Sequence, residues 1–181
     1  MKYTLIREVD SANGPGVRVS LFVSGCRLKC KGCFNEIAQN FDNGFEFTEG
    51  TIDKILDLCS KDYIQGLTLL GGDSLEKENQ EGTLELLKAF RTKFGNSKDV
   101  WCWTGRVYDK ALVTNGRDYI EGVTDEFLSR IDILVDGPFV QSLNKKALIY
   151  MGSTNQRIID MPQTLKQGKV VLSYYDSIER R

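Results

Sequence analysis

The stretch Arg18-Val19-Ser20-Leu21-Phe22-Val23-Ser24-Gly25-Cys26-Arg27-Leu28-Lys29-Cys30-Lys31-Gly32-Cys33-Phe34-Asn35 joins a β-rich run to three closely spaced cysteines. Its first six residues mix β-branched and aromatic side chains, which predicts a strand ending near Gly25. The cysteines supply three thiolates, whereas a closed zinc or iron-sulfur site normally has four protein ligands. The chain contains no histidine to complete the set. We therefore expect Cys26, Cys30 and Cys33 to hold a four-iron cluster whose fourth iron is open to a small molecule.

The remaining cysteines, Cys59 and Cys102, lie in apolar runs that are typical of core elements. Two other interpretations of the triplet stay open, which are a zinc knuckle completed by a distant Cys or carboxylate and a disulfide with a spare thiol. The odd count of five cysteines and the charged first ten residues, which lack an apolar signal segment, disfavour disulfides. Reduced thiols indicate a cytoplasmic protein.

Three basic residues, Arg27, Lys29 and Lys31, alternate with the cysteines. Positive charge next to a thiol favours the thiolate, and it partly compensates the negative charge of a thiolate-ligated cluster. This pattern favours the cluster over the zinc and disulfide interpretations, because neither of those explains the basic residues.

Further short motifs occur along the chain. In order, they are Asn13-Gly14-Pro15-Gly16-Val17-Arg18, Gly71-Gly72-Asp73, Trp101-Cys102-Trp103-Thr104-Gly105, Val135-Asp136-Gly137-Pro138-Phe139 and Gly152-Ser153-Thr154-Asn155-Gln156-Arg157. The Cys-x-x-x-Cys-x-x-Cys spacing resembles the signature of the radical S-adenosylmethionine superfamily. Together with these motifs, it resembles the activating proteins of anaerobic ribonucleoside-triphosphate reductases from about Asn13 to Asp160.

The sequence departs from the superfamily pattern at two positions. Gly32 stands where many members carry an aromatic residue before the third cysteine, although glycine is familiar in the narrower family. Ser74 stands where proline usually closes the glycine-glycine-acid motif, which leaves the turn less rigid without removing its backbone groups.

The resemblance implies an enzyme that uses a [4Fe-4S] cluster and S-adenosyl-L-methionine. A reduced cluster would cleave S-adenosylmethionine to methionine and a 5′-deoxyadenosyl radical, which takes hydrogen from a glycine of the partner. That partner is the large catalytic subunit of an anaerobic (class III) ribonucleoside-triphosphate reductase, and a flavodoxin-type protein is an expected electron donor.

The cofactor-binding residues are expected at the motifs. Gly71 and Gly72 would let the backbone approach the methionine moiety, because glycine permits close contact. The adenosyl side would be bordered by Gly32, Cys33 and Phe34. Weaker candidates for polar contacts are Asp73, Thr104 and Asp136, for which the alternative is a role only as turn or cap residues.

Composition indicates a compact protein. The 181 residues are 41% hydrophobic, enough for one core, so we expect a single domain over 1–181 with 146–181 as a candidate C-terminal extension. The formal charge of −1 gives no basis for nucleic-acid binding. No apolar run approaches the roughly 20 residues of a membrane span, and phosphate-binding glycine motifs are missing.

The hydrophobic pattern alternates strands and helices. Predicted strands cover Arg18–Val23, Gly66–Leu70, Val100–Trp103 and Ile131–Val135; predicted helices cover Thr51–Lys61 and Glu81–Phe94, and another starts near Thr124. This order predicts an α/β fold with a mostly parallel sheet. A complete barrel needs about 250 residues, so we expect an incomplete, open β/α barrel of the radical S-adenosylmethionine type.

Two details of the fold are also predicted. Trp101 and Trp103 are expected on alternate sides of one strand as core residues. The tail from Gln163 to Arg181 is expected to be either an extra strand, Lys169–Tyr174, or a partner-binding arm.

The motifs fall at the carboxyl ends of the predicted strands, where parallel α/β folds bind ligands. Two rival functions remain open at this point. The nearer is another radical S-adenosylmethionine enzyme, acting on a different glycyl-radical target or a small molecule. The more distant is a non-catalytic iron-sulfur or zinc module.

Overall fold

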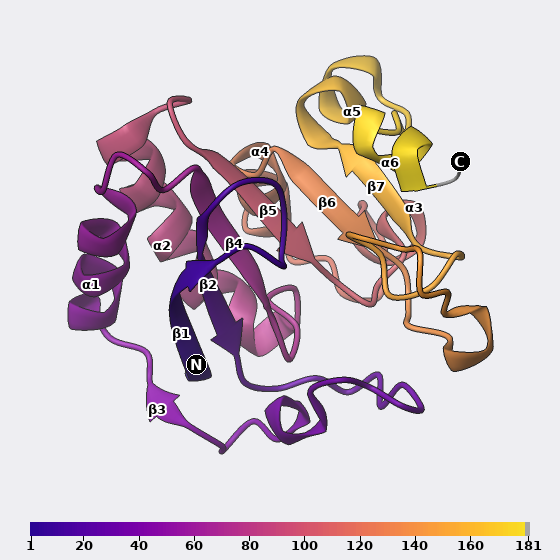
Figure 1. Cartoon of the computed structure of the whole chain (residues 1–181), viewed down its shortest axis with the longest axis horizontal. Helices are drawn as coiled ribbons and strands as arrows, with labels where there is room; N and C mark the ends of the chain where they lie inside the picture. The colour runs from indigo at the N-terminus through magenta and orange to yellow at the C-terminus, as the bar shows by residue number, and fades with distance from the viewer. Residues whose placement is uncertain (180–181) are drawn as a thin grey trace.

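A computed structural model describes residues 1–179 of the chain and shows a seven-stranded sheet in the order β3-β1-β2-β4-β5-β6-β7 (Figure 1). The strands are β1 Lys2–Asp10, β2 Arg18–Val23, β3 Phe45–Glu46, β4 Gly66–Gly71, β5 Asp99–Trp103, β6 Ile133–Asp136 and β7 Arg157–Asp160. The helices are α1 Glu49–Cys59, α2 Lys77–Phe94, α3 Tyr108–Ala111, α4 Thr124–Ser129, α5 Met161–Gln167 and α6 Tyr174–Glu179, with single 3-10 turns at η1 Glu36–Gln39 and η2 Gln141–Leu143.

The centre of the sheet is parallel and its edges are antiparallel. Strands β2, β4, β5 and β6 run parallel, whereas β1 and β3 on one side and β7 on the other are antiparallel to their neighbours. The order ends at β3 and at β7, so the described sheet is open. The predicted α/β class is confirmed, and the barrel type stays a prediction.

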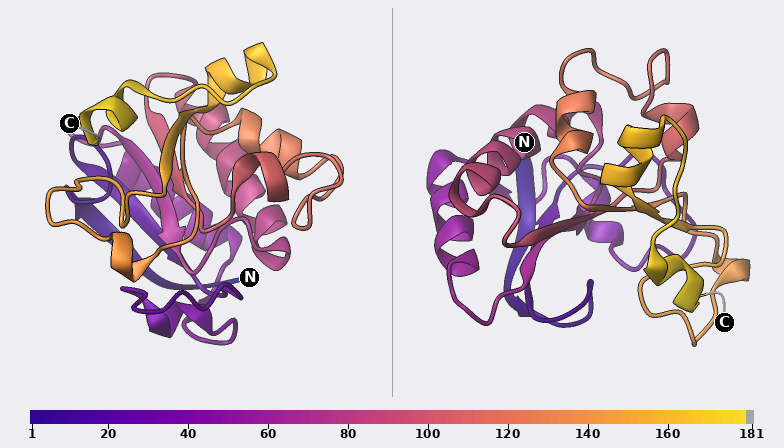
Figure 2. Two further views of the ribbon diagram at one scale, coloured as in Figure 1. Left: turned by 90° about the vertical axis from the view of Figure 1, so that its right-hand side faces the viewer. Right: turned by 90° about the horizontal axis from the view of Figure 1, so that it is seen from above.

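Side chains alternate between two cores along the strands, as strand geometry requires. On one face Leu134 and Cys102 pack with the apolar sides of α1, α2 and α4. On the other face Trp101 and Val135 pack with Tyr175 of α6. Figure 2 shows this division, with α1 and α2 covering one side of the curved sheet and α6 lying on the other.

Helix α1 begins two residues before its predicted start and α2 begins four residues before. Thr48 and Thr51 form a capping box at the start of α1, which the apolar spacing could not show. The first turns of α2 are buried through polar side chains. Asn79 donates to the carbonyls of Ser24 and Asp73, and Gln80 is bonded inside the same region. Because the buried residues at the start of α2 are polar and hydrogen-bonded, this part of the helix shows no apolar periodicity in the sequence.

Helix α2 ends before Gly95, which has a φ of 54°, as predicted. The sequence prediction missed β1, a strand that mixes charged and apolar residues and in which only Asp10 is buried. Its role is to pair antiparallel with β2.

Two predictions are wrong. Trp101 and Trp103 lie on the same face and stack, with ring centroids 5.5 Å apart, because residues two apart in a strand share a face. The stretch Lys169–Tyr174 is not a strand; Leu172 forms one bridge to Ile159, and α6 starts at Tyr174. The last two residues of the predicted tail, 180–181, lie outside the described residues. None of the helices among residues 1–179 combines the length and apolar character needed to cross a membrane.

Candidate functional site

A cavity of about 600 Å³ opens at the carboxyl ends of the parallel strands. It lies where the loops after β2, β4, β5 and β6 meet, which is the edge that the sequence predicted. Its lining includes Asn13, Cys26, Leu28, Cys30, Gly32, Cys33, Phe34, Gly71, Gly72, Trp103, Thr104, Gly105, Phe139, Gln141, Tyr150 and Gln156. The structure therefore places all three motif cysteines and five of the other predicted site residues on the lining of one cavity.

The cysteine loop follows β2 and is held by its backbone. The amide of Gly25 donates to the carbonyl of Ala38 at 2.7 Å, and the amide of Cys26 donates to that of Gln39 at 3.1 Å. Gly25 has a φ of 99°, and a Cβ there would lie 2.3 Å from the Phe41 ring. Only glycine meets both requirements, so this position fixes where the loop leaves the strand.

The thiols of Cys26, Cys30 and Cys33 are free and partly accessible, whereas Cys59 and Cys102 are free and buried. In residues 1–179 no three His, Cys, Asp or Glu side chains converge as ligands of a single metal ion would. An iron-sulfur cluster binds each thiolate at a different iron, so its ligands need not converge on one point. Three unpaired thiols along one open cavity fit a cluster with an open iron.

The basic residues of the loop were predicted to favour the thiolate form of the cysteines, and for Cys26 they do not. Arg27 is taken up by carboxylates, with Nη1 2.9 Å from Glu76 and 2.7 Å from Glu78. Burial, followed by the charge of Asp73, raises the pKa of Cys26 to about 12. In the absence of a cluster this thiol stays protonated, so binding of a cluster must release its proton.

The glycine-glycine turn packs against the cysteine loop. Gly71 has a φ of 113°, and a Cβ there would lie 2.6 Å from the backbone of β2. A Cβ at Gly72 would lie 2.5 Å from the Gly25 carbonyl oxygen and 2.7 Å from that of Ala38. Both glycines line the cavity, but their missing side chains make room for the protein's own backbone. Close approach within the protein is therefore the first reason for glycine at these positions.

Asp73 is not part of the cavity lining. Its carboxylate is buried and accepts from Thr104 Oγ1 at 2.8 Å, from the amide of Gly105 at 3.1 Å and from Arg106 at 2.6 Å. Burial raises the pKa of Asp73, and Arg106 opposes that rise. Thr104 lines the cavity and is oriented from behind by Asp73, so these two predicted residues form one unit.

Arg106 is the centre of a buried ionic cluster that the sequence prediction missed. Its side chain lies 2.6 Å from Asp73, 3.0 Å from Glu76 and 3.0 Å from Asp118. Glu76 in turn accepts from the backbone amide of Arg27 at 2.6 Å. The cluster thus connects the turn after β4 and the loop after β5 to the cysteine loop.

Asp136 is also set back from the cavity. Its carboxylate accepts from Arg157 Nε at 2.9 Å and from the amide of Tyr108 at 2.8 Å. It joins the end of β6 and the start of β7 to the start of α3. The structure brings Asp136 to the same end of the sheet as the cysteines without placing it on the wall of the cavity.

Comparison with known proteins identifies an iron-sulfur family over most of the chain. The family model described as "4Fe-4S single cluster domain" matches residues 12–159. The anaerobic ribonucleoside-triphosphate reductase-activating protein of Enterobacteria phage T4 is 39% identical over 87% of this chain and 93% of its own. The protein of that name from Escherichia coli K12 is 37% identical over 86% and 96%, and that from Vibrio cholerae is 36% identical over 87% and 97%.

The chain belongs to the family of anaerobic ribonucleoside-triphosphate reductase-activating proteins. The sequence resemblance is thereby confirmed, and so is the use of an iron-sulfur cluster with S-adenosylmethionine. The matched region contains all three motif cysteines and every loop that lines the cavity.

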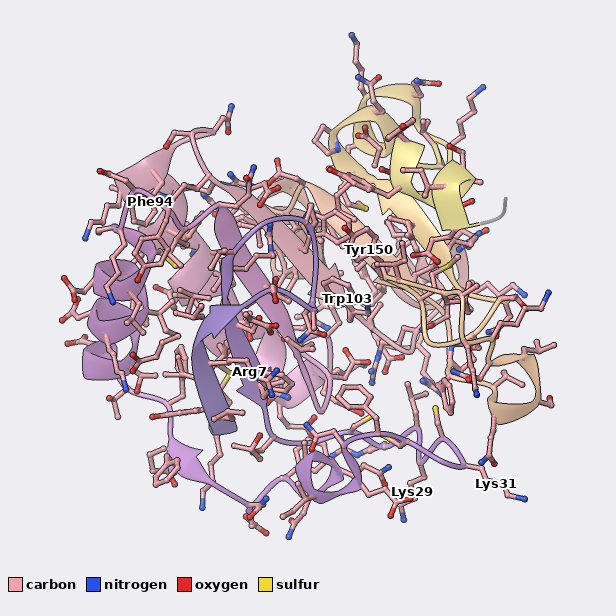
Figure 3. All side chains as sticks on the ribbon, viewed as in Figure 1. Arg7, Lys29, Lys31, Phe94, Trp103 and Tyr150 are labelled. Atoms are coloured by element: carbon pink, nitrogen blue, oxygen red, sulfur yellow. The ribbon has the colours of Figure 1, made fainter. Side chains whose placement is uncertain are left out.

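The wall of the cavity opposite the cysteines was not predicted. It is formed by residues 137–156, which follow β6 and include η2. A Cβ at Gly32, whose φ is 73°, would lie 3.0 Å from the Gln141 side chain. Trp103 donates from Nε1 to the carbonyl of Tyr150 at 3.0 Å, and Figure 3 shows these two residues next to each other. The sequence signal for this wall consists of the two family motifs at its ends, residues 135–139 and 152–157.

Helix α6 holds this wall in place. The carboxylate of Glu179 accepts from the amide of Ile149 at 2.9 Å and also from the amide of Tyr150. Tyr175 packs edge-on against Trp101, with centroids 5.0 Å apart. The C-terminal helix therefore supports the side of the cavity that faces the cysteines.

Proposed function

We propose that this protein activates an anaerobic (class III) ribonucleoside-triphosphate reductase by generating a glycyl radical on it, through reductive cleavage of S-adenosylmethionine at a [4Fe-4S] cluster. The observation that carries the proposal is the meeting of three free thiols and the glycine-glycine turn at one open cavity, in a chain of this family. The relatives' name supplies the target.

Cys26, Cys30 and Cys33 would hold the cluster, because they are the accessible thiols on the cavity. When bound, the reduced cluster supplies the electron that cleaves S-adenosylmethionine to methionine and a 5′-deoxyadenosyl radical. The turn at Gly71 and Gly72 would lie against the methionine moiety. These roles rest on placement at the cavity and on the resemblance.

The other lining residues would orient the adenosyl group and exclude water. Gly32 and Phe34 border the cysteine side. The Thr104 hydroxyl donates to Asp73 and accepts from the amide of Arg106, so it could offer the adenosyl group only its remaining lone pair, as an acceptor. We assign Asp73 and Asp136 positioning roles, since neither is on the lining.

An open cavity suits a macromolecular substrate. A glycine of the reductase must reach the site on a loop of the partner, and an incomplete β/α barrel would leave that side accessible while still limiting water. We propose that barrel type for the open sheet. We also propose the cytoplasm as the compartment and a flavodoxin-type protein as the electron donor.

Label transfer tests the function. The reductase is labelled with deuterium at glycine α-carbons and mixed anaerobically with the cluster-loaded protein, S-adenosylmethionine and dithionite. We expect deuterium in 5′-deoxyadenosine and a doublet radical signal on the reductase by electron paramagnetic resonance. Formation of unlabelled 5′-deoxyadenosine beside a radical-free reductase would support the rival small-molecule enzyme. Absence of S-adenosylmethionine binding would support the non-catalytic module.

A further inference from the structure

The mouth of the cavity has an unusual charge distribution. It is formed by the cysteine loop, residues 25–35, and by the opposite wall, residues 137–156. Of the 24 Lys and Arg residues in the chain, these two segments contain five, whereas they contain none of the 25 Asp and Glu residues. The chain as a whole has a formal charge of −1, so these two segments differ from the rest by lacking acidic residues and carry a net positive charge. The carboxylate of Glu179 from α6 contacts the opposite wall, where the amides of Ile149 and Tyr150 donate to it.

Four of the five basic residues are exposed and have no acidic partner in the part of the chain that is described. Arg27 is paired with Glu76 and Glu78. The exposed lysines are Lys29, Lys31, Lys145 and Lys146, and none forms an ion pair within residues 1–179. Figure 3 shows Lys29 and Lys31 directed outward from the cysteine loop. Their charge is available to a partner.

Exposed apolar side chains accompany these lysines. Phe34 is 80% exposed on the cysteine loop, and Ile149 is 62% exposed on the opposite wall. Both segments touch across the site, because Gly32 lies against Gln141. The mouth thus combines apolar contacts on two sides with a positive rim, a combination typical of protein interfaces with a charged periphery.

The lysines of the cysteine loop have a second explanation. Lys29 and Lys31 lie between the ligands, so they can offset the negative charge of the thiolate-ligated cluster. Lys145 and Lys146 are separated from the ligands in sequence and are not part of the cavity lining. Compensation of cluster charge does not account for this second pair.

Resting on the proposed function, we infer that Lys145 and Lys146, with Phe34 and Ile149, form a docking rim that recognises an acidic segment of the reductase around its target glycine. The rim attracts the acidic segment, and the apolar side chains cover the mouth once the glycine is inserted. Opposite charge across the rim accelerates association and sets the orientation of the loop.

The test compares Lys145→Glu/Lys146→Glu with a matched control, Lys166→Glu/Lys169→Glu, whose lysines are exposed on and just after α5. Each is loaded with cluster and assayed with dithionite as reductant, which removes the electron donor from the measurement. We expect the KM for the reductase to rise about tenfold at low salt in the rim variant. The control should not change, and the difference should shrink at 0.5 M salt, where the Debye length falls to roughly 4 Å.

Three outcomes are informative. Unchanged KM in the rim variant overturns the inference, while radical formation by the unmodified protein leaves the proposed function standing. If no protein forms a glycyl radical, the proposed function itself fails. A second assay replaces dithionite with a flavodoxin-type donor. If the rim variant is impaired only in that assay, the rim binds the electron donor, and the assignment to the reductase is overturned. Cleavage of S-adenosylmethionine without reductase should be equal in all variants and reports an intact site.

Discussion

Replacing Arg106 with methionine should strongly destabilise the protein. The Arg106 side chain is 1% exposed, and it contacts Asp73 and Glu76, which are 1% and 2% exposed. Removing one partner of a buried ion pair typically costs about 3–5 kcal/mol, because a buried charge is left unpaired. In the variant, Glu76 still pairs with Arg27, and Asp73 still accepts hydrogen bonds from three other donors. We therefore expect a loss near the lower end, about 3 kcal/mol in the free energy of unfolding.

The effect should depend on pH in a defined direction. Burial raises the pKa of Asp73 even with Arg106 opposing it, so in Arg106→Met that pKa rises further. A carboxyl group whose folded pKa is above its unfolded pKa binds more protons in the folded state, and its contribution to stability falls as pH rises. The loss caused by Arg106→Met should accordingly be smaller at pH 5 than at pH 8.

Urea unfolding of the metal-free protein, followed by tryptophan fluorescence under reducing conditions, measures both effects. Arg117→Met is the matched control, since Arg117 is 71% exposed and pairs with Asp118 at the surface; it should cost less than about 1 kcal/mol. A loss below about 1 kcal/mol for Arg106→Met at pH 8, or one that grows as pH falls, would refute the reasoning.

Three further predictions follow from the site. Cys30→Ala should lose the four-iron cluster while Cys59→Ala retains it, as judged by iron and sulfide content; the opposite pattern would overturn the ligand assignment. Gly72→Val should lose cluster and S-adenosylmethionine binding together, because its side chain meets the backbone of the cysteine loop; a normal cluster spectrum would contradict this. Glu179→Ala should speed hydrogen exchange at the amide of Ile149 by about tenfold or more, given roughly 1.5–3 kcal/mol for a charge-assisted bond; unchanged exchange would show that α6 does not support the wall.

Local patterns predicted the centre of the sheet well. The strands beginning at Arg18 and Gly66 were predicted within a residue of their ends, because buried strands are rich in β-branched, aromatic and other apolar residues and these two are followed closely by glycine. Helix α2 was predicted to end near Gly95 because glycine is a helix stop signal, and it ends at Phe94. The start of α2 was missed, since its first turns are buried by hydrogen bonds to residues distant in sequence.

The C-terminal region shows the limit of such patterns. Lys169–Tyr174 has the composition of a strand, but only Leu172 finds a bridging partner. Asp160 instead caps α5 by accepting from the amide of Gln163 at 2.9 Å. The segment does meet the free edge of β7, since the amide of Asp160 donates to the carbonyl of Val171 at 2.9 Å and that of Ser173 donates to the carbonyl of Ile158 at 2.7 Å. The pairing stops after one bridge because α6 begins at Tyr174, so strand composition alone does not determine how far pairing extends.

The sequence by itself determined the family, through the order of its motifs, and the spacing of Cys26, Cys30 and Cys33 predicts which residues hold the cluster. Only the tertiary structure showed that Asp73 and Asp136 are held by Arg106 and Arg157 behind the cavity. Spacing along one loop is a local property that a sequence displays directly. The partner of a buried charge is distant in sequence: Arg106 follows the parallel strand β5, and Arg157 begins the antiparallel strand β7. Its identity is decided only when the strands assemble into the sheet.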